Sequence, residues 1–326
     1  MDPCSTIFLD QPEFWQEKEK TDEQKAMICQ RAQTLSDGQR LPLGRKIKYA
    51  VQALAMASNT GVKWALNYSG GRDSTVLSHL AVTRCGLRYP HVFVNTRIEY
   101  PETYRQIHVW RKWLSEYDVS LETILPEKKP EQVWKEEGFP LWSKKIASKY
   151  RQWFSTANDN HLRGIPKKVL EDFYKLRDRG IKISDTCCDK LKKNPLKAYD
   201  KRTGVNGHIL GCRAQEAQNR RLAFIQRGSL YKSKKGWICN PLVYWKESDV
   251  EEYLDRFDIY PILSEYGGSG CRCCTFGCHL GRAPLQELHE INPKYHEKVM
   301  NDWGFHQIAD ILSPEKQEEQ GRLFHG

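Results

Sequence analysis

The stretch Val62-Lys-Trp-Ala-Leu-Asn-Tyr-Ser-Gly-Gly-Arg-Asp-Ser-Thr-Val76 decides the fold of this chain. Its first part, through Tyr68, is mostly apolar and predicts a short buried strand. Two glycines follow, and from Thr75 to Cys85 the apolar residues recur at helical spacing. A strand that leads through glycines into a helix gathers backbone N–H groups and the positive end of the helix dipole around one point. The sequence therefore predicts a phosphate-binding loop.

The residues of this loop have the properties that a nucleotide phosphate requires. Glycines allow close approach of the backbone, the serines offer hydroxyls, and Arg72 offers cationic donors. Asp73 can organise the loop or bind Mg²⁺ beside the phosphates. A tight turn is the alternative interpretation of a lone Ser-Gly-Gly, but the flanking strand and helix favour the phosphate site. We expect the nucleotide to contact Ser69, Gly70, Gly71, Arg72, Asp73, Ser74 and Thr75.

The rest of the chain continues the alternation of strands and helices. Further strands are predicted at 91–95, 119–125, 208–211 and 238–243, with an amphipathic helix at 104–117. This order is typical of an α/β fold with a parallel sheet. We expect three parts: a helical N-terminal extension at 1–58, an α/β domain at 59–262 with a basic helical insertion near 126–184, and a Cys-rich segment with a helical tail at 263–326.

Three motifs resemble one known superfamily. Ser69-Gly-Gly-Arg-Asp-Ser74 resembles the PP-loop of ATP pyrophosphatases. Asn95-Thr-Arg-Ile-Glu-Tyr-Pro-Glu-Thr103 and Gly211-Cys-Arg-Ala-Gln-Glu-Ala-Gln-Asn-Arg220 resemble segments of its PAPS reductase (CysH-type) and DndC-like branch. One departure is Ala217, where the family usually has Ser. The resemblance covers roughly residues 63–277 and implies a Rossmann-like, HUP-type parallel sheet with flanking helices, extended by helices at both ends.

The resemblance also implies a set of site residues. ATP would be the bound nucleotide, with Asn95, Thr96 and Glu99 at its pocket. Charge at the start of the following helix is the alternative role for Glu99. The resemblance assigns catalytic roles to Asp73, Arg213 and Arg220, with Mg²⁺ near Asp73 left open.

Two groups of cysteines, Cys187-Cys188 and Cys271-Arg-Cys-Cys274, lie about eighty residues apart. Four thiolates from two pairs suit a tetrahedral metal or a cluster, and the spacing alone does not distinguish zinc from iron–sulfur. The pattern is similar to the 4Fe-4S arrangement of adenylylsulfate reductases and DndC-like proteins of phages and bacteria. That resemblance implies the ligands Cys187, Cys188, Cys271 and Cys274, and leaves Cys273 and Cys278 as alternative ligands or persulfide carriers.

The net charge of +10 indicates an anionic partner. Basic residues gather between Lys144 and Lys193, and we expect helices there to hold a nucleic acid or a ribonucleoprotein, with Trp142 and Trp153 stacking on bases. A solvated basic surface is the alternative. No apolar stretch approaches the roughly eighteen residues of a membrane span, and Met1 to Arg40 does not resemble a signal peptide. We expect a cytoplasmic protein without membrane contact, in which clustered cysteines serve metal or redox chemistry.

The choice of reaction depends on two departures from the reductases of the family. Those enzymes carry a catalytic cysteine in a C-terminal Glu-Cys-Gly-Leu-His segment, whereas no cysteine follows Cys278 here. They also generally lack the complete loop. We therefore predict an ATP-dependent sulfurtransferase that adenylates its substrate and takes sulfur from a cysteine desulfurase or another donor. The alternatives are a divergent PAPS or APS reductase and a non-catalytic nucleic-acid or ribonucleoprotein accessory module of a phage or defence system.

Overall fold

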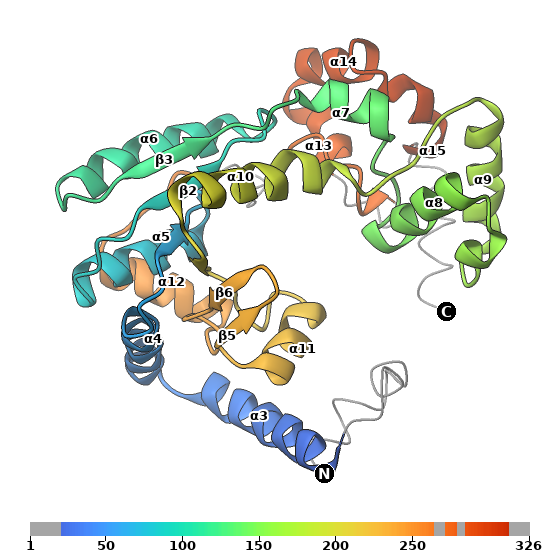
Figure 1. Cartoon of the computed structure of the whole chain (residues 1–326). Helices are drawn as coiled ribbons and strands as arrows, with labels where there is room; N and C mark the ends of the chain where they lie inside the picture. Colours follow the sequence, from blue (N-terminus) through green and yellow to red (C-terminus); the bar gives the residue numbers. More distant parts are fainter. Residues whose placement is uncertain (1–20, 264–270, 279–283, 313–326) are drawn as a thin grey trace. The chain divides into compact units, whose positions relative to one another are not determined.

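The computed structural model describes residues 21–263, 271–278 and 284–312 (Figure 1). The chain forms two compact units that alternate along the sequence. Of the described residues, the first unit comprises 21–93, 102–122 and 203–263. The second comprises 94–101, 123–202, 271–278 and 284–312.

A six-stranded sheet confirms the predicted α/β fold. Its strands are β1 (Trp64–Asn67), β2 (His91–Val94), β3 (Leu121–Ile124), β4 (Gly207–Ile209), β5 (Leu230–Ser233) and β6 (Gly236–Cys239). Their order is β3-β2-β1-β4-β6-β5. β1 pairs in parallel with β2 and β4, and β4 pairs in parallel with β6. β5 lies antiparallel to β6 and was not predicted, because its short Leu-Tyr-Lys-Ser sequence has no apolar run.

Helices of the first unit flank this sheet. They are α3 (Asp22–Arg40), α4 (Leu43–Ser58), α5 (Arg72–His79), the π-helix η1 (Leu80–Arg84), α6 (Pro101–Ser115), α11 (Gln218–Arg227) and α12 (Glu247–Arg256). α3 begins at a capping box between Thr21 and Gln24, and Pro42 separates it from α4. Between α4 and α12 a buried ion pair joins Lys46 Nζ to Asp249 Oδ2 at 2.6 Å.

A buried chain of hydrogen bonds links helix α5 to strand β2 and helix α6. The Trp110 indole N–H donates to Ser78 Oγ at 2.8 Å. Ser78 Oγ lies 2.7 Å from His91 Nε2, and His91 Nδ1 lies 3.0 Å from the carbonyl oxygen of Tyr89. Because the carbonyl can only accept, Nδ1 carries the proton and Nε2 accepts from the serine hydroxyl. The chain is complete only when His91 is neutral.

This arrangement predicts a pH dependence of stability. Burial lowers the pKa of His91 to about 4, below the ordinary value of 6.5, although the bond to Tyr89 opposes the shift. The unfolded state therefore binds the proton first, so stability is complete above pH 6.5 and declines as the pH falls from 6.5 towards 4. In a His91→Gln variant, the dependence of unfolding free energy on pH in this window should be shallower by about 1.4 kcal/mol per pH unit, the contribution of one proton. Denaturant titrations at several pH values measure this slope. His108→Gln, at an exposed position of α6, is the control and should keep the wild-type slope; a wild-type slope in His91→Gln as well would contradict the prediction.

The second unit is helical, with an aromatic core. Its helices are α7 (Pro130–Glu137), α8 (Lys144–Thr156), the 3₁₀-helix η2 (Asp159–Leu162), α9 (Lys167–Asp178), the π-helix η3 (Asp189–Lys193), α10 (Asn194–Thr203), α13 (Pro284–Ile291), α14 (Pro293–Asn301), the 3₁₀-helix η5 (Phe305–Ile308) and α15 (Ala309–Leu312). The rings of Tyr150 and Phe173 stack with centroids 3.9 Å apart, and Trp142 packs on Tyr150 at 5.3 Å. Across the described residues, none of the helices has both the length and the apolar character that a membrane crossing needs.

The aromatic core corrects one expectation. Trp142 is fully buried, so its indole belongs to the core and is not available to stack on a base. Trp153 is partly buried, with its ring 5.4 Å from that of Phe173 and its N–H bound to Asp159. The expectation of base stacking is therefore wrong for Trp142, whereas stacking by the partly exposed Trp153 stays a prediction.

Candidate functional site

The phosphate loop in the first unit connects β1 to α5. α5 begins at Arg72, three residues before the predicted start, because Gly71 is its N-cap. The hydroxyls of Ser74 and Thr75 both donate to the carbonyl oxygen of Gly71, at 2.9 and 3.0 Å. Half of the motif thus forms the first helical turn, so its N–H groups stand at the positive end of the helix dipole.

Close approaches of neighbouring backbone hold the loop in shape. Gly70 has φ +79°, and a side chain there would also place its Cβ 3.2 Å from Thr103 Cγ2. A Cβ on Gly211, in the loop after β4, would lie 3.0 Å from the carbonyl oxygen of Asp73. The hydroxyls of Ser69 and Ser74 lie 3.2 Å apart. The positive φ of Gly70 therefore favours glycine, and the segment after β4 packs directly on the phosphate loop and leaves little room for a side chain at Gly211.

That packing joins two of the three predicted catalytic residues, Asp73 and Arg213. Arg213 Nε donates to Asp73 Oδ1 at 2.9 Å, and Arg213 is almost fully buried. Its backbone N–H donates to Glu216 Oε1 at 2.8 Å, while the other oxygen of Glu216 pairs with Arg220. Burial raises the pKa of Asp73, and the charge of Arg213 opposes that shift. Arg213 is thus fixed beside the first turn of α5.

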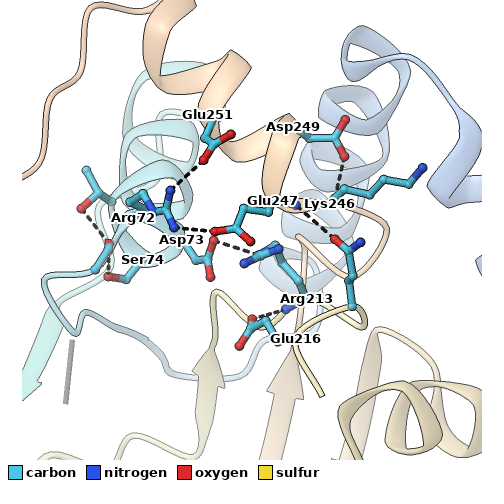
Figure 2. A network of polar contacts seen from close by, with 12 residues as sticks. Arg72, Asp73, Ser74, Arg213, Glu216, Lys246, Glu247, Asp249 and Glu251 are labelled. Carbon is cyan, nitrogen blue, oxygen red and sulfur yellow. Dashed lines mark hydrogen bonds and ion pairs between the residues drawn. The ribbon is translucent and has the colours of Figure 1, made fainter. Parts of the chain in front are cut away.

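Arg72 is also held by carboxylates. Figure 2 shows it reaching to α12, where it contacts Glu251 at 2.9 Å and Glu247 at 2.5 Å. Both carboxylates are more than half exposed, and exposed pairs of this kind contribute about 0–1 kcal/mol. A bound phosphate could therefore exchange with them at little cost. No role was predicted for Glu216, Glu247 or Glu251. Glu216 lies within the segment Gly211–Arg220 quoted above.

The second unit contains the other predicted nucleotide residues, in the segment after β2. The Thr96 hydroxyl donates to Glu99 Oε1 at 2.7 Å, and Asn95 accepts from the N–H of Arg97 at 2.8 Å. Glu99 is buried, and its backbone forms an isolated antiparallel β-bridge with that of Cys271. Thr96 Oγ1 lies 3.7 Å from Cys271 Sγ. Within this unit, Thr96 and Glu99 therefore border the cysteines, and their contact with a nucleotide remains a prediction.

Four predicted metal ligands converge in the second unit. Cys187 and Cys188 precede η3, and Cys271 and Cys274 belong to the segment that pairs with Glu99. All four line one small, mostly apolar cavity, which is also lined by Ile98, Trp134, Pro140, Leu191, Lys192 and Cys273. Residues more than eighty positions apart thus direct soft sulfur ligands to one place.

Electrostatics favours a thiolate at this cavity. The Cys187 thiol donates a hydrogen bond to Cys188. This bond lowers the pKa of Cys188, and the charges of Lys144 and Lys192 lower it further. The same bond and burial raise the pKa of Cys187. Because the thiolate is the metal-binding form of cysteine, the lowered pKa of Cys188 favours its role as a ligand.

Lys192 is a candidate site residue that sequence reasoning missed, and it lines the cavity of the cysteines. Its Nζ lies 3.9 Å from Glu99 Oε1, and it hydrogen-bonds Cys271. Burial lowers its pKa, but Cys271, Glu99 and Cys188 raise it more, so the ammonium is retained. The signal was present: Lys192 follows Cys188 by four residues, the spacing of one helix face.

The two additional cysteines occupy the core of the second unit. Cys273 and Cys278 are fully buried, and Cys273 Sγ lies 4.0 Å from the hydroxyl of Tyr295. Burial raises the pKa of Cys273 to about 12, although Arg272 opposes the shift. A buried, protonated thiol has the character of a packing residue.

The four cysteines supply soft sulfur donors for a metal group. Among residues 21–263, 271–278 and 284–312, no three His, Cys, Asp or Glu side chains meet closely enough to hold a single ion. A single zinc needs each sulfur about 2.3 Å from one centre. In a 4Fe-4S cluster each of four cysteines binds a different iron, so the thiolates surround a larger object. Four cysteines with Lys144 and Lys192 beside them have the donor chemistry of the larger group, and the thiols would have to enlarge their cavity of about 30 Å³ to hold it.

Comparison with known proteins identifies one family and several similar folds. The family described as phosphoadenosine phosphosulfate reductase domain matches residues 63–276 of the chain. No curated protein matches the chain.

Solved structures with a similar fold include the following three. The phosphate complex of phosphoadenylyl-sulfate (PAPS) reductase from Candida auris is 16% identical, with 65% of this chain and 81% of that chain covered and a TM-score of 0.41. The U34-tRNA thiolase NcsA from Methanococcus maripaludis, with its [4Fe-4S] cluster, is 14% identical, with 80% and 78% covered and a TM-score of 0.36. NMN synthetase from Francisella tularensis is 17% identical, with 81% and 93% covered and a TM-score of 0.41.

Proposed function

This chain belongs to the phosphoadenosine phosphosulfate reductase domain family, and we propose that it is an ATP-dependent sulfurtransferase of the DndC-like kind. It adenylates an acceptor group on a nucleic acid and then replaces an oxygen atom of that group by sulfur. The observation that carries the proposal is the convergence of four cysteines on one cavity in a chain whose PP-loop is complete.

In the first step the loop binds the phosphates of ATP. N–H groups at the start of α5 face the pyrophosphate, with the hydroxyls of Ser69 and Ser74 beside them. The acceptor oxygen attacks the α-phosphorus, and the bond from that phosphorus to pyrophosphate breaks. Arg213, held by Asp73, stabilises the negative charge that develops. Asp73 is the residue that would hold Mg²⁺, which would supply further positive charge to the leaving pyrophosphate.

In the second step sulfur replaces the activated oxygen. A hydrosulfide sulfur attacks the acceptor carbon, the carbon–oxygen bond breaks, and AMP leaves with that oxygen. The sulfur arrives as sulfide, or as the outer sulfur of a cysteine desulfurase persulfide, from which a thiol reductant releases hydrosulfide and is itself oxidised to a disulfide. Cys187, Cys188, Cys271 and Cys274 would hold a 4Fe-4S cluster, which would supply soft iron able to bind sulfur.

The charge of the second unit supports a nucleic-acid acceptor. Residues 123–202 contain 20 Lys and Arg against 11 Asp and Glu, so this segment accounts for +9 of the chain's net charge of +10. A concentrated basic surface attracts the phosphate backbone and gives a binding affinity that falls with salt. The nucleic acid could be presented alone or within a ribonucleoprotein.

Anaerobic protein incubated with ATP, sulfide and either cellular small RNA or genomic DNA tests the proposal. We expect AMP and pyrophosphate to form only with one of these acceptors, and mass spectrometry of the digested acceptor to detect a thiolated nucleoside. Thiol-dependent release of sulfite from PAPS or APS would instead identify a reductase. Nucleic-acid binding that survives Asp73→Ala, with no AMP formed from any acceptor, would identify a binding module.

A further inference from the structure

A second pocket in the second unit takes no part in the site described above. It lies beyond the end of β3, between the residues that follow the strand and the helices η3 and α10. Its volume is about 520 Å³, within the range of about 300–1,000 Å³ that is usual for small-molecule sites. The pocket is thus large enough for a single small group but not for a helix or strand.

The pocket has an apolar surface with polar groups at its side. Leu125, Pro195 and Ala198 contribute aliphatic surface, and Leu125 is 53% exposed although its side chain is fully apolar. Thr123 and Asn194 add a hydroxyl and an amide, which can both donate and accept hydrogen bonds. An apolar surface combined with such polar groups suits a heterocyclic base, which has an apolar face and a polar edge.

The charged residues of the pocket suit a phosphate. Lys128, Lys190 and Arg202 are three cations of the lining, against the single acid Glu127. Lys190 Nζ pairs with Glu137 Oε1 at 2.9 Å, and both side chains are partly exposed. Pairs of this kind contribute about 0–1 kcal/mol, so a phosphate can replace the carboxylate. The guanidinium of Arg202 lies over the ring of Tyr199, 5.5 Å from its centroid.

One short helix connects this pocket with the cysteine cavity. Lys190 of η3 lines the pocket, while Leu191 and Lys192 of the same helix line the cavity. η3 has the wide π-helical turn that is frequent at functional sites. A group bound in the pocket would therefore lie a few side chains from Cys188.

We propose that this pocket binds one unpaired nucleotide of a single-stranded nucleic acid, with its base against Leu125 and Ala198 and its phosphate at Lys190 and Arg202. This inference rests on the proposed function and deepens it, since it places a nucleotide of the acceptor beside the cysteines. A base paired within a duplex cannot enter, because it would first have to leave the stack.

Fluorescence anisotropy with labelled single strands of about twelve nucleotides, one of RNA and one of DNA, tests the inference without ATP. Ala198→Trp fills the pocket at an exposed position without changing charge. We expect it to weaken single-strand binding about tenfold, as expected for the loss of a stacked base, and to leave the affinity for a duplex of the same sequence unchanged. The preferred single strand, RNA or DNA, identifies the source of the nucleotide.

A matched pair of charge variants provides the second measurement. Arg202→Ala should lower the salt dependence of single-strand binding by about one phosphate contact, whereas Lys201→Ala, an equally exposed neighbour outside the pocket, should lower it less. Equal effects of the two variants, together with wild-type affinity in Ala198→Trp, would show that the surface binds by charge alone and would overturn the pocket. AMP formation by the wild type would still support the proposed reaction in that case. Failure of the wild-type protein to bind either strand would overturn both the pocket and the nucleic-acid acceptor.

Discussion

Replacing Cys187 by serine should release the iron and acid-labile sulfide of the anaerobically purified protein, and replacing Cys273 by alanine should leave both in place. Cys187 lines the cavity as partner of the Cys188 thiolate, and a serine hydroxyl is a much poorer ligand for iron. Iron, zinc and sulfide assays with an ultraviolet–visible spectrum measure the outcome. We expect a broad visible absorption band, with roughly four irons per chain, in the wild type and in Cys273→Ala but not in Cys187→Ser.

Cys273 is the matched control because it lies in the same short segment as two predicted ligands. It also lines the cavity, but it is fully buried and its thiol lies near Tyr295. Equal loss of iron in both variants would mean that the metal responds to packing of the core, and the four-ligand assignment would be wrong. Zinc in the wild type, without sulfide, would assign the cysteines to a structural ion.

The fold was predictable where its signals are local. β1, the glycine turn and α5 lie within a continuous stretch of about twenty residues, so periodicity and turn chemistry reveal all three. The strands of the parallel sheet were predicted for the same reason. β5 was missed because it is an edge strand, whose polar residues satisfy pairing without burial.

Features that depend on contacts between distant residues could not be predicted. Arg72 meets Glu251 across 179 positions, and Arg213 meets Asp73 across 140. The burial of Trp142 likewise depends on its packing against the aromatic core, which the local sequence does not reveal. The division into units is of the same kind, since residues 94–101 join the second unit by pairing with Cys271 and Arg272.

Replacing Arg213 by alanine is expected to lower the rate of AMP formation by about 10²–10³-fold, the usual effect of removing one preorganised donor from a developing negative charge. The reason is local: a buried guanidinium is fixed beside the first turn of α5 by Asp73. Rates at saturating ATP measure this effect, and filter binding measures ATP affinity. Arg221→Ala, an exposed neighbour of Arg220 on α11, is the control and should keep the wild-type rate.

A structural role for Arg213 predicts a different pattern. The variant leaves Asp73 without its cation, so the pKa of Asp73, already raised by burial, should rise further. Because the native state then holds the proton more tightly than the unfolded state, the stability lost relative to wild type should grow as the pH rises. The double variant Asp73→Asn/Arg213→Ala removes the partly buried charge and should restore stability but not activity, because both residues have assigned roles in the reaction. If it restores the rate as well, the transition-state role of the Arg213 guanidinium and the Mg²⁺ role of Asp73 are both wrong.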